Sequence, residues 1–423
     1  MMAKHIGVIG SGTAGLHLGL FLQQQGVDVT LYSDKTPDQI ESGRLLNTVA
    51  HHAATIANET ALGVNHWPTE ECGYFGHNYY VGTKDPMRFF GKLRNPSRAV
   101  DYRIYQPALM RDFESRGGKI VYGEIEHDDI AKLADTYDLL VVSTGKGPLG
   151  RMFEHDPANS PFDRPQRALC CGLFKGIAEP ETRAVTMYFS PGAGEMIEIP
   201  TLSFNGMVSA LVIENHIGGE LEVLSKIKYD EDPKAFLALL YEKLKQHYPT
   251  CAERIDRDEF DLANGPGDIL QGAVTPTVRK TAVQLDNGTF AVALGDVQAV
   301  VDPVLGQGAN AASYAAMVMG EQIVGNEVFD QRFVDKLNMA RNDRVLAATH
   351  WTNFMLRHLK EGTPELMQFL DAIAAYPVLA DEFTTNFDAP DKQWDCFASP
   401  ERIEAWVAQT LASRSEVREP VAA

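Results

Sequence analysis

Two glycine-flanked segments late in the chain carry residue types that suit a nucleotide-like ligand. The apolar run 290–294 is typical of a buried strand, and Gly295-Asp296 follows it directly. Residues 302–308 are punctuated by proline and glycine, and the alanine-rich run from Ala309 favours a helix. A carboxylate after a strand accepts hydrogen bonds from a polyol, and a helix start behind glycines presents free N–H groups. A flavin dinucleotide needs both features, although an ordinary strand-loop-helix crossover has the same pattern.

The N-terminal segment decides in favour of a dinucleotide. The pattern predicts a strand over His5–Ile9, the turn Gly10-Ser-Gly-Thr-Ala-Gly15, a helix ended by Gly26, and a second strand over 27–32. GxGxxG between a strand and a helix is specific for dinucleotide binding. Its first glycine makes the turn, its second lets the backbone approach a pyrophosphate, and its third lets the helix pack on the strand. The acid expected for the adenosine ribose is displaced, so either Ser33 or Asp34 serves.

Length, charge and cysteine content restrict the class of protein. A chain of 423 residues has room for two or three domains. The net charge of −19 argues against nucleic acid and anionic membranes as partners, and the apolar runs are too short for a membrane span. Five cysteines without C-x-x-C or metal-ligand spacing indicate reduced thiols and no metal site. Because the first strand begins close to Lys4, we expect no signal peptide and a cytoplasmic protein.

The remaining pattern predicts an α/β protein with a Rossmann-type FAD-binding domain, a β-sheet substrate domain and C-terminal helices. We expect the FAD-binding domain at residues 1–70, 98–160 and 275–330, the substrate domain at 71–97 and 161–274, and the helical region at 331–423. In the first, we predict a loop over 38–48, helices over 49–62 and 102–116, and a strand over 137–143. In the second, we predict strands over 73–82, 169–174, 183–191, 196–203 and 209–214, with a helix over 233–248.

Several long runs resemble one family of flavoproteins. They are 15–22, 44–51, 73–77, 98–103, 199–207 and 302–310, with further matches at 383–394 and 399–403. Together with Thr144-Gly145 and Gly295-Asp296, these runs make the whole chain similar to flavoprotein monooxygenases of the aromatic-hydroxylase (PHBH-like) fold. Within that class the chain most resembles the oxygenase component of the styrene monooxygenases. The flavin halogenases fit less well, because Glu198 rather than tryptophan precedes Ile199-Pro200.

The resemblance implies an external, two-component, group E flavoprotein monooxygenase of aromatic hydrocarbon catabolism. Such an enzyme receives reduced FAD from a separate NADH-dependent flavin reductase, forms a flavin hydroperoxide with O2, and converts styrene or a related aryl alkene to its epoxide. A sister branch acts on indole, toward indigo. A non-catalytic FAD-fold binding protein is a further alternative, against which the intact Asp296 and its following loop argue. We also expect a homodimer.

The segment after the predicted strand 137–143 supports an external source of electrons. Single-component aromatic hydroxylases carry an Asp-Gly pair there, tied to NAD(P)H binding. This chain reads Ser143-Thr-Gly-Lys-Gly147 instead, with no acid, and the sequence has no second glycine-rich nucleotide fold.

The candidate site residues divide into those for FAD and those for a small apolar aromatic substrate. The residues expected to bind FAD are Gly10, Gly12, Thr13, Ala14, Gly15, Ser33, Asp34, Arg44, Leu45, Leu46, Asn47, Thr48, Arg103, Gly295, Asp296, Pro303, Gly306, Gly308, Ala309 and Asn310. The residues expected to line the substrate pocket are Asn47, Val49, Tyr74, His77, Ser97, Met187, Ile199, Val212 and Pro303.

The roles of these residues are positioning and exclusion of water. The first five pocket residues are the types that the resemblance implies for styrene rather than indole, and they must gather in space to act together. Met187, Ile199 and Val212 fit an ordinary core equally well, and Tyr74 and His77 either orient the reactive oxygen or form a hydrogen-bonded aromatic cluster. Oxygen transfer is the cofactor's own chemistry, so we assign no catalytic acid or base. The helix start at 308–310 is expected to stabilise the anionic reduced ring.

Overall fold

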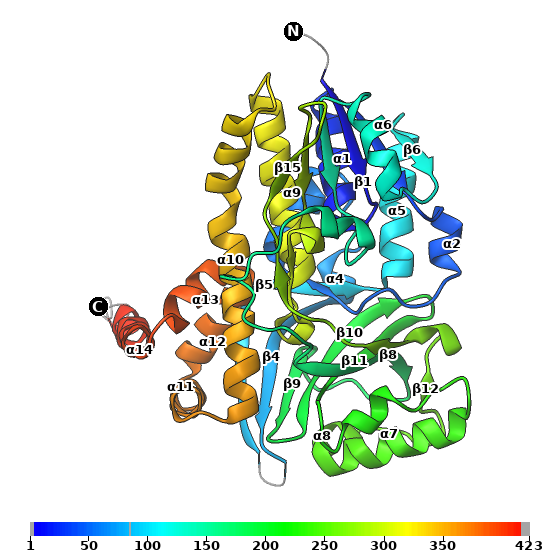
Figure 1. Ribbon diagram of the computed structural model, residues 1–423. Coiled ribbons are helices and arrows are strands. Elements are labelled where there is room, and N and C mark those ends of the chain that lie inside the picture. The colour runs from blue at the N-terminus through cyan, green and yellow to red at the C-terminus, as the bar shows by residue number, and fades with distance from the viewer. Residues whose placement is uncertain (1–3, 84–85, 416–423) are drawn as a thin grey trace, which may run out of the picture. The chain divides into compact units, whose positions relative to one another are not determined.

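The computed structural model describes residues 4–83 and 86–415, which form two compact units (Figure 1). Unit 1 comprises the chain up to Pro68, Val100–Pro165 and Val274–Thr349, and unit 2 comprises Thr69–Ala99, Gln166–Ala273 and the chain from His350 on. The boundary between Thr349 and His350 falls inside the long helix α10 (Gln331–Glu361). In neither described range does a helix combine the length and hydropathy needed to span a membrane. The assignment of the units to cofactor and substrate stays a prediction.

Unit 1 is built on a mostly parallel sheet in the order β15-β16-β7-β1-β2-β6. Its strands are β1 (His5–Ile9), β2 (Asp28–Ser33), β6 (Lys119–Tyr122), β7 (Leu139–Val142), β15 (Ala282–Gln284) and β16 (Phe290–Ala293). Only β15 runs antiparallel to its neighbour. All residues of β7 and β16 are buried, as expected for parallel strands that are covered on both faces. Ile9, Val142 and Ala293 are register partners, so the segments after β1, β7 and β16 leave the sheet at one edge.

The helices of unit 1 carry the segments that follow these strands. They are α1 (Thr13–Gln24), α2 (Pro37–Glu41), α3 (Ala53–Ala61), α5 (Tyr102–Ser115), α6 (Ile130–Ala134), α9 (Gln307–Gly325) and the first part of α10. Short elements are β3 (Ala50–His51), β14 (Thr277–Val278), β17 (Ala299–Val300) and the 3-10 helices η1 (His127–Asp129), η2 (Pro148–Met152), η5 (Gly295–Val297) and η6 (Pro303–Leu305). Helices α1 and α9 pack closely, because a Cβ on Gly320 would lie 2.3 Å from the ring of Phe21.

Unit 2 is built on a largely antiparallel sheet in the order β12-β8-β11-β10-β9-β4-β5, with β13 also paired to β8. Its strands are β4 (Gly73–Val81), β5 (Met87–Val100), β8 (Arg167–Lys175), β9 (Val185–Ser190), β10 (Gly194–Ser203), β11 (Gly206–His216), β12 (Asp261–Leu262) and β13 (Ile269–Gly272). The pairing of β4 with β9 is parallel. The remaining elements are α4 (Thr69–Cys72), η3 (Glu222–Ser225), α7 (Pro233–His247), α8 (Pro249–Ala252), η4 (Pro266–Asp268), α11 (Pro364–Ala375), α12 (Pro377–Thr385), η7 (Asn386–Asp388), α13 (Pro390–Phe397) and α14 (Pro400–Ser415).

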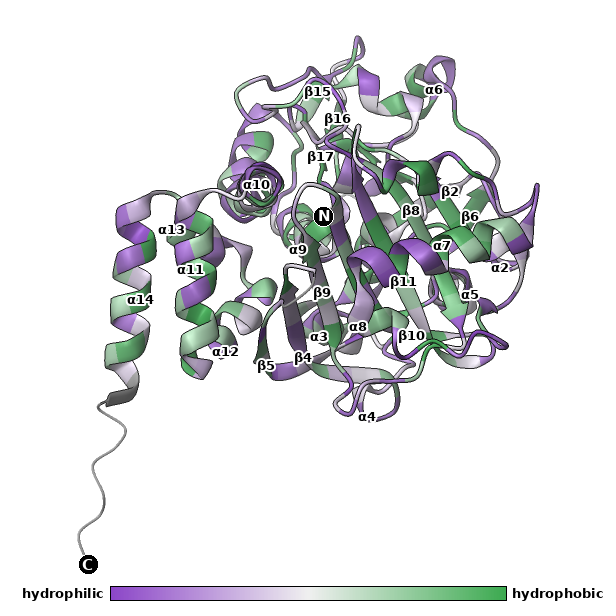
Figure 2. Cartoon of the chain, turned by 90° about the horizontal axis from the view of Figure 1, so that it is seen from below, coloured by the Kyte–Doolittle hydropathy of each residue, from purple (hydrophilic) through white to green (hydrophobic). Residues whose placement is uncertain are grey.

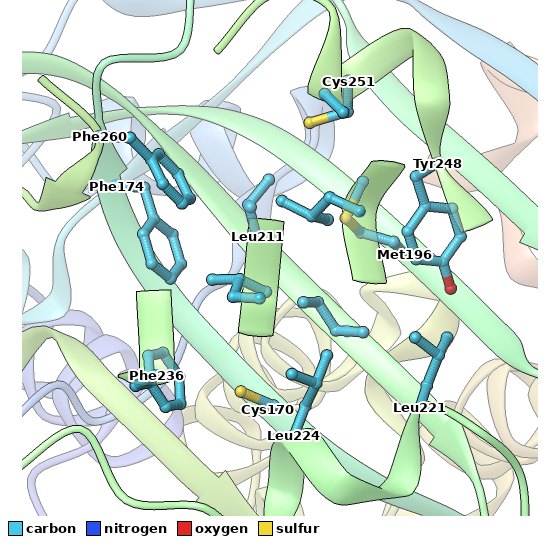
Figure 3. Packing of buried hydrophobic residues seen from close by; sticks show 14 of the residues in the cluster. Cys170, Phe174, Met196, Leu211, Leu221, Leu224, Phe236, Tyr248, Cys251 and Phe260 are labelled. Carbon is cyan, nitrogen blue, oxygen red and sulfur yellow. The ribbon is translucent and has the colours of Figure 1, made fainter. Parts of the chain in front are cut away.

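Helix α7 covers one face of the unit 2 sheet. Its apolar side, with Phe236 and Leu240, is buried in a cluster of hydrophobic residues from β8, β10 and β11 (Figure 3). In the same cluster the rings of Phe174 and Phe260 stack with centroids 5.4 Å apart. The hydropathy colouring of Figure 2 shows both hydrophilic and hydrophobic residues along α7, which is the pattern of a helix with one buried side.

Some predicted element boundaries are wrong. Residues 38–41 belong to α2 rather than to a loop, because the side chains of Thr36 and Gln39 form a reciprocal capping box around Pro37. The helix predicted from residue 49 begins at Ala53, after the short strand β3. Helix α9 begins at Gln307, two residues before the alanine-rich run. The strand β5 was not predicted, because Arg88, Lys92 and Arg94 give its exposed side the charge of a solvated segment.

Candidate functional site

The turn after β1 has the backbone geometry that binding of a pyrophosphate requires. Gly10 has φ 118°, and a Cβ there would lie 2.4 Å from the carbonyl oxygen of Ser143. A Cβ on Gly15 would lie 2.0 Å from the Gly10 carbonyl oxygen, so only glycine lets α1 approach β1 this closely. A Cβ on Gly12 would meet nothing within 4 Å. The N-cap of α1 is Gly12, which has no side chain to cap the helix, so the N–H groups that start at Thr13 are available to an anion.

The two residues predicted for the adenosine ribose have different environments. Ser33 Oγ lies 2.7 Å from Ser11 Oγ, which belongs to the glycine turn, and donates to the carbonyl oxygen of Lys35 at 2.7 Å. The Ser33 side chain is therefore occupied within the protein and stabilises the glycine turn. Asp34 is exposed and makes no hydrogen bond to any described residue. Asp34 is therefore the residue of the two whose side chain is available to a ribose.

The two arginines predicted to bind FAD also differ. Arg103 lies buried in the first turn of α5, where Asp101 binds its guanidinium: Nε donates to Oδ1 at 3.0 Å and Nη2 to Oδ2 at 2.6 Å. This pairing neutralises the charge of Arg103 inside the protein, so its guanidinium is less suited to bind a phosphate of FAD. Arg44 is exposed on the segment after α2.

Asp296 follows β16 at the edge of the sheet from which the glycine turn also leaves. Gly295 takes φ 64° and starts η5, and the Asp296 carboxylate forms no hydrogen bond within the described ranges. Burial raises the pKa of Asp296, which the positive charge of Lys146 partly offsets. On the neighbouring segment, the hydroxyl of Thr144 is buried without a hydrogen-bond partner among the described residues. These oxygen atoms are acceptors that suit the hydroxyl groups of a polyol.

The start of α9 has a glycine at its N-cap and therefore lacks a capping side chain at that position. Gly306 takes φ 62° at the N-cap and has no side chain to cap the helix, so the N–H groups of Gly308 and Ala309 have no acceptor within the described turns of the helix. The Asn310 side chain, by contrast, is fully used: its Oδ1 accepts from the N–H of His52 at 2.9 Å and from Thr55 Oγ1 at 2.8 Å. Its Nδ2 donates to the carbonyl oxygens of Ala50 and Gly306, both at 2.9 Å. Asn310 thus positions the helix start rather than offering its side chain to a ligand.

Three of the predicted pocket residues come together in unit 2. Tyr74 and Ser97 are partners across β4 and β5, and their hydroxyl groups hydrogen-bond. The ring of His77 lies 5.9 Å from that of Tyr74, and His77 Nδ1 lies 3.2 Å from the hydroxyl of Tyr79. All four side chains are buried. This is the hydrogen-bonded aromatic cluster that we held as the alternative to a role at the reactive oxygen.

The other three pocket candidates of unit 2 share one face of its sheet. Met187 pairs with Ile197, and Ile197 pairs with Val212, while Ile199 follows two residues later on the same face. The neighbouring residues Tyr188, Met196 and Ile213 point to the opposite face and belong to the cluster under α7. Tyr79 is the register partner of Met187, so the aromatic cluster continues this apolar face.

Asn47, Val49 and Pro303 belong to unit 1, and their relation to the unit 2 residues remains a prediction. The side-chain oxygen of Asn47 is a buried atom with no hydrogen-bond partner among the described residues. Val49 is half-buried just before β3, and Pro303 begins η6.

Comparison with known proteins decides which family has this arrangement. A family model for the styrene monooxygenase A substrate-binding domain matches residues 145–254. Styrene monooxygenase StyA of Pseudomonas fluorescens is 60% identical over 408 residues, which cover 96% of this chain and 98% of the relative. The chain belongs to the styrene monooxygenase family. It is therefore a flavin-dependent oxidoreductase, and the predicted resemblance is confirmed.

Solved structures show the fold of this styrene monooxygenase family member. The flavin-dependent brominase Bmp2 matches with a TM-score of 0.64 at 14% identity, over 98% of this chain and 100% of its own. PqsL of Pseudomonas aeruginosa, described as a FAD-dependent monooxygenase, matches with a TM-score of 0.62 at 12% identity, over 85% of this chain and 97% of its own. The predicted α/β fold of the aromatic-hydroxylase type is confirmed.

The residues of unit 1 fit the FAD on which the family depends. The open space in front of Gly12 and the uncapped α1 suit the pyrophosphate, and Asp296, without a partner in the described chain, suits the ribityl hydroxyls. The uncapped start of α9 suits the electron-rich edge of the reduced ring. The structure thus offers open space at Gly12, carboxylate and hydroxyl oxygens at Asp296 and Thr144, and N–H groups at the starts of α1 and α9.

The sequence analysis missed residues that complete these clusters. In unit 2, Phe387 and Trp351 extend the aromatic cluster: the Phe387 ring lies 4.7 Å from that of His77 and 5.0 Å from that of Trp351. The match at 383–394 was the signal that could have indicated Phe387. In unit 1, hydrogen bonds join the buried residues Glu59, His51 and Tyr102 to Thr13 in the glycine turn. His51 and Tyr102 lie in the matching runs 44–51 and 98–103, but nothing in those runs indicated that the two side chains meet.

Proposed function

We propose that this protein epoxidises styrene and related aryl alkenes, using reduced FAD and O2. The observation that carries the proposal is the 60% identity to a styrene monooxygenase over 96% of the chain, because it extends through both the cofactor turn and the sheet of unit 2. The apolar face with Met187, Ile199 and Val212 supports a substrate without hydrogen-bonding groups.

In this proposal the protein binds FAD, orients it and excludes water from the reaction. Reduced FAD together with O2 supplies the oxygen atom that the alkene receives. Thr13 to Gly15 hold the pyrophosphate, Asp296 accepts from the ribityl hydroxyls, and the N–H groups at Gly308 and Ala309 stabilise negative charge on the ring. Leu45, Leu46, Thr48 and Pro303 are proposed to border the ring, and the apolar face of unit 2 excludes water.

We further propose that a separate NADH-dependent flavin reductase supplies the reduced FAD. The segment Ser143-Thr-Gly-Lys-Gly147 supports this, because it has no acid, whereas single-component relatives of the fold carry an Asp-Gly pair there. A homodimeric, cytoplasmic enzyme remains our expectation from the sequence.

The experiment that tests the proposed function uses purified protein, photoreduced FAD, O2 and a panel of styrene, indole and a thioether. We expect styrene oxide to form with the highest kcat/KM. Oxygenated indole without styrene oxide would assign the chain to the indole branch instead. FAD binding without any oxygenated product would favour a non-catalytic binding protein.

A further inference from the structure

The segment that carries Asp296 is anchored at both ends on helix α10. Before Asp296, the carbonyl oxygen of Ala293, the last residue of β16, accepts a hydrogen bond from Arg341 Nη2 at 3.0 Å. After it, Gln298, which follows η5 directly, donates from Nε2 to Asn342 Oδ1 at 3.0 Å. Because Arg341 and Asn342 are consecutive, a single turn of α10 holds the chain on both sides of Asp296.

Both anchors lie inside unit 1, where water does not compete for their hydrogen bonds. Arg341 is 0% exposed and Gln298 is 2% exposed. The backbone of Gln298 is fixed as well, because its N–H donates to the carbonyl oxygen of Gly295 at 2.9 Å and its own carbonyl oxygen accepts from the N–H of Arg279 at 2.8 Å. A shift of either end would leave buried polar groups unpaired, which is costly.

Gly295, directly before Asp296, lies against the two helices whose starts are proposed to bind FAD. It takes φ 64°, and a Cβ there would lie 3.2 Å from the Cβ of Ala14 in α1 and 3.7 Å from the Cβ of Ala312 in α9. The anchors on α10 therefore set the position of Asp296 relative to both helices. A small displacement of a binding group from its productive place is enough to lower affinity or rate.

Arg341 is an expensive choice for an anchor, which indicates that its position matters. A neutral side chain could also donate to a carbonyl oxygen, whereas a buried cation loses its hydration. Burial lowers the pKa of Arg341 to about 9. Among the described residues, Nε and Nη1 of Arg341 have no hydrogen-bond partner, so the contact with Ala293 is the hydrogen bond that its guanidinium makes there.

We propose that Arg341 is a positioning residue for the cofactor, which acts through Ala293 to hold the Asp296 carboxylate where the ribityl chain needs it. The Gln298–Asn342 hydrogen bond is the second anchor of the same segment. With both anchors in place, FAD meets a carboxylate that is already ordered, so binding does not have to order it. This inference rests on the proposed place of the ribityl hydroxyls at Asp296.

The test is a double-mutant cycle on the Kd for FAD, measured by titration with flavin absorbance or fluorescence. Arg341→Met keeps a long unbranched side chain and removes the donors. In the wild-type background it should raise the Kd by about fivefold or more. In the Asp296→Ala background it should change the Kd by less than about twofold, because the carboxylate that Arg341 positions is gone. A residue that only stabilises the fold would have the same effect in both backgrounds.

Two further variants of α10 make the cycle independent of a single substitution. Asn342→Leu removes the second anchor and should repeat the pattern of Arg341→Met, also in the event that Arg341→Met does not fold. Thr349→Val is the matched control, because Thr349 is 0% exposed and its hydroxyl donates to the Val345 carbonyl oxygen of the same helix at 3.1 Å. Thr349→Val should lower the melting temperature and leave the Kd for FAD unchanged.

The outcomes separate this inference from the cofactor site itself. Equal losses of affinity in both backgrounds overturn the inference, and so does an unchanged Kd in folded Arg341→Met and Asn342→Leu proteins. Either result leaves the role of Asp296 intact, provided that Asp296→Ala weakens FAD binding. An unchanged Kd in Asp296→Ala protein contradicts the proposed cofactor site and overturns the inference with it. Thermal melts of each variant establish that it is folded.

Discussion

The backbone N–H of His52 donates to the side-chain oxygen of Asn310 at 2.9 Å, which ties the start of α9 to the segment before α3. Three further hydrogen bonds of the Asn310 side chain involve Thr55, Ala50 and Gly306. The N–H groups of Gly308 and Ala309 lie in the turn that the Asn310 side chain fixes. The direction of these N–H groups is therefore set by a residue whose own side chain is fully hydrogen-bonded within the protein.

We expect Asn310→Ala to weaken both the fold and FAD binding. The truncation leaves partly buried donors and acceptors unpaired, at about 1–3 kcal/mol for each buried group, so the free energy of unfolding should fall by about 2 kcal/mol or more. The matched control is Asn58→Ala, which removes a 3.0 Å hydrogen bond to Ser313 farther along the same helix pair. FAD titrations should show a larger loss of affinity for Asn310→Ala than for Asn58→Ala. Equal losses would show that the helix start has no special role.

Asp296 should show opposite effects on cofactor affinity and on stability. Asp296→Asn and Asp296→Ala are expected to raise the Kd for FAD by one to two decades, since a hydrogen bond to a charged group contributes about 1.5–3 kcal/mol. The raised pKa means that the ionised carboxylate costs stability in the apoprotein at neutral pH, and that this cost disappears as pH falls through the pKa in the folded state.

The apoprotein of Asp296→Asn should therefore melt at or above the wild-type temperature at neutral pH. The two melting temperatures should converge in acid. A titration in which both variants bind FAD as tightly as wild type would remove Asp296 from the cofactor site.

NADH alone should not reduce bound FAD at a useful rate. The segment Ser143 to Gly147 has no acid, and Lys146 lies close enough to Asp296 to affect its pKa. Anaerobic stopped-flow absorbance should show no fast bleaching of the flavin until a flavin reductase is added. Rapid bleaching by NADH alone would contradict the need for a partner enzyme.

Exchange of five residues should change the choice between styrene and indole. Asn47, Val49, Tyr74, His77 and Ser97 are the types expected on the styrene side, and Tyr74, His77 and Ser97 lie together in unit 2. Changing all five to the types of the indole side should shift relative kcat/KM toward indole by at least tenfold, about 1.4 kcal/mol. A smaller exchange, limited to Tyr74 and Ser97, tests their shared hydrogen bond. An unchanged preference at an unchanged melting temperature would exclude these residues from specificity.

A buried ion pair in unit 2 should make the protein sensitive to acid. Arg167 donates to both carboxylate oxygens of Glu195 at 2.6 and 2.8 Å, and His216 lies 3.2 Å away. Burial favours the neutral acid, but these hydrogen bonds outweigh it and lower the pKa of Glu195 below its ordinary 4.5. The stability that this carboxylate contributes is present above pH 4.5 and is lost as pH falls through the lowered pKa.

Glu195→Gln should destabilise the protein by about 3 kcal/mol or more at neutral pH, because it leaves a buried arginine without its counter-charge. Denaturant unfolding at several pH values should show the difference from wild type shrinking in acid. A difference that is the same at all pH values would contradict the role of the charge.

Local signals in the sequence explain which parts of the fold were predictable. The strand-turn-helix unit at Gly10–Gly15 and the strand before Gly295 were predicted from local sequence, because short apolar runs indicate buried strands and glycines indicate the tight turns that follow them. The helix α2 had a readable capping box at Thr36 and Gln39, which was overlooked. The strand β5 could not be predicted, because the charged residues on its exposed side resemble a solvated segment.

The residues of the candidate site were predictable only where a function requires one particular residue type. Glycines and Asp296 stand out by identity, and the structure places them at one edge of the sheet as expected. By contrast, hydrogen bonds connect Glu59 through His51 and Tyr102 to Thr13. Glu59 is 46 positions from Thr13 in the sequence, and Tyr102 is 89 positions from it. Hydrogen bonds over such separations depend on the packing of α1, α3 and α5, which no periodicity in the sequence encodes.

The order in which unit 1 is assembled has a consequence for biosynthesis. Strand β16 pairs with β7 in the middle of its sheet, yet β16 begins only at Phe290, and α9 ends at Gly325. A ribosome releases the glycine turn early, but that turn lacks Asp296 and the α9 start until about three quarters of the chain have been made. Domains fold as units during synthesis, so unit 1 cannot complete its sheet until the β4–β5 hairpin and the strands β8 to β11 of unit 2 have emerged between its parts. Supply of FAD during translation is thus expected to affect the yield of folded protein only in the last part of elongation.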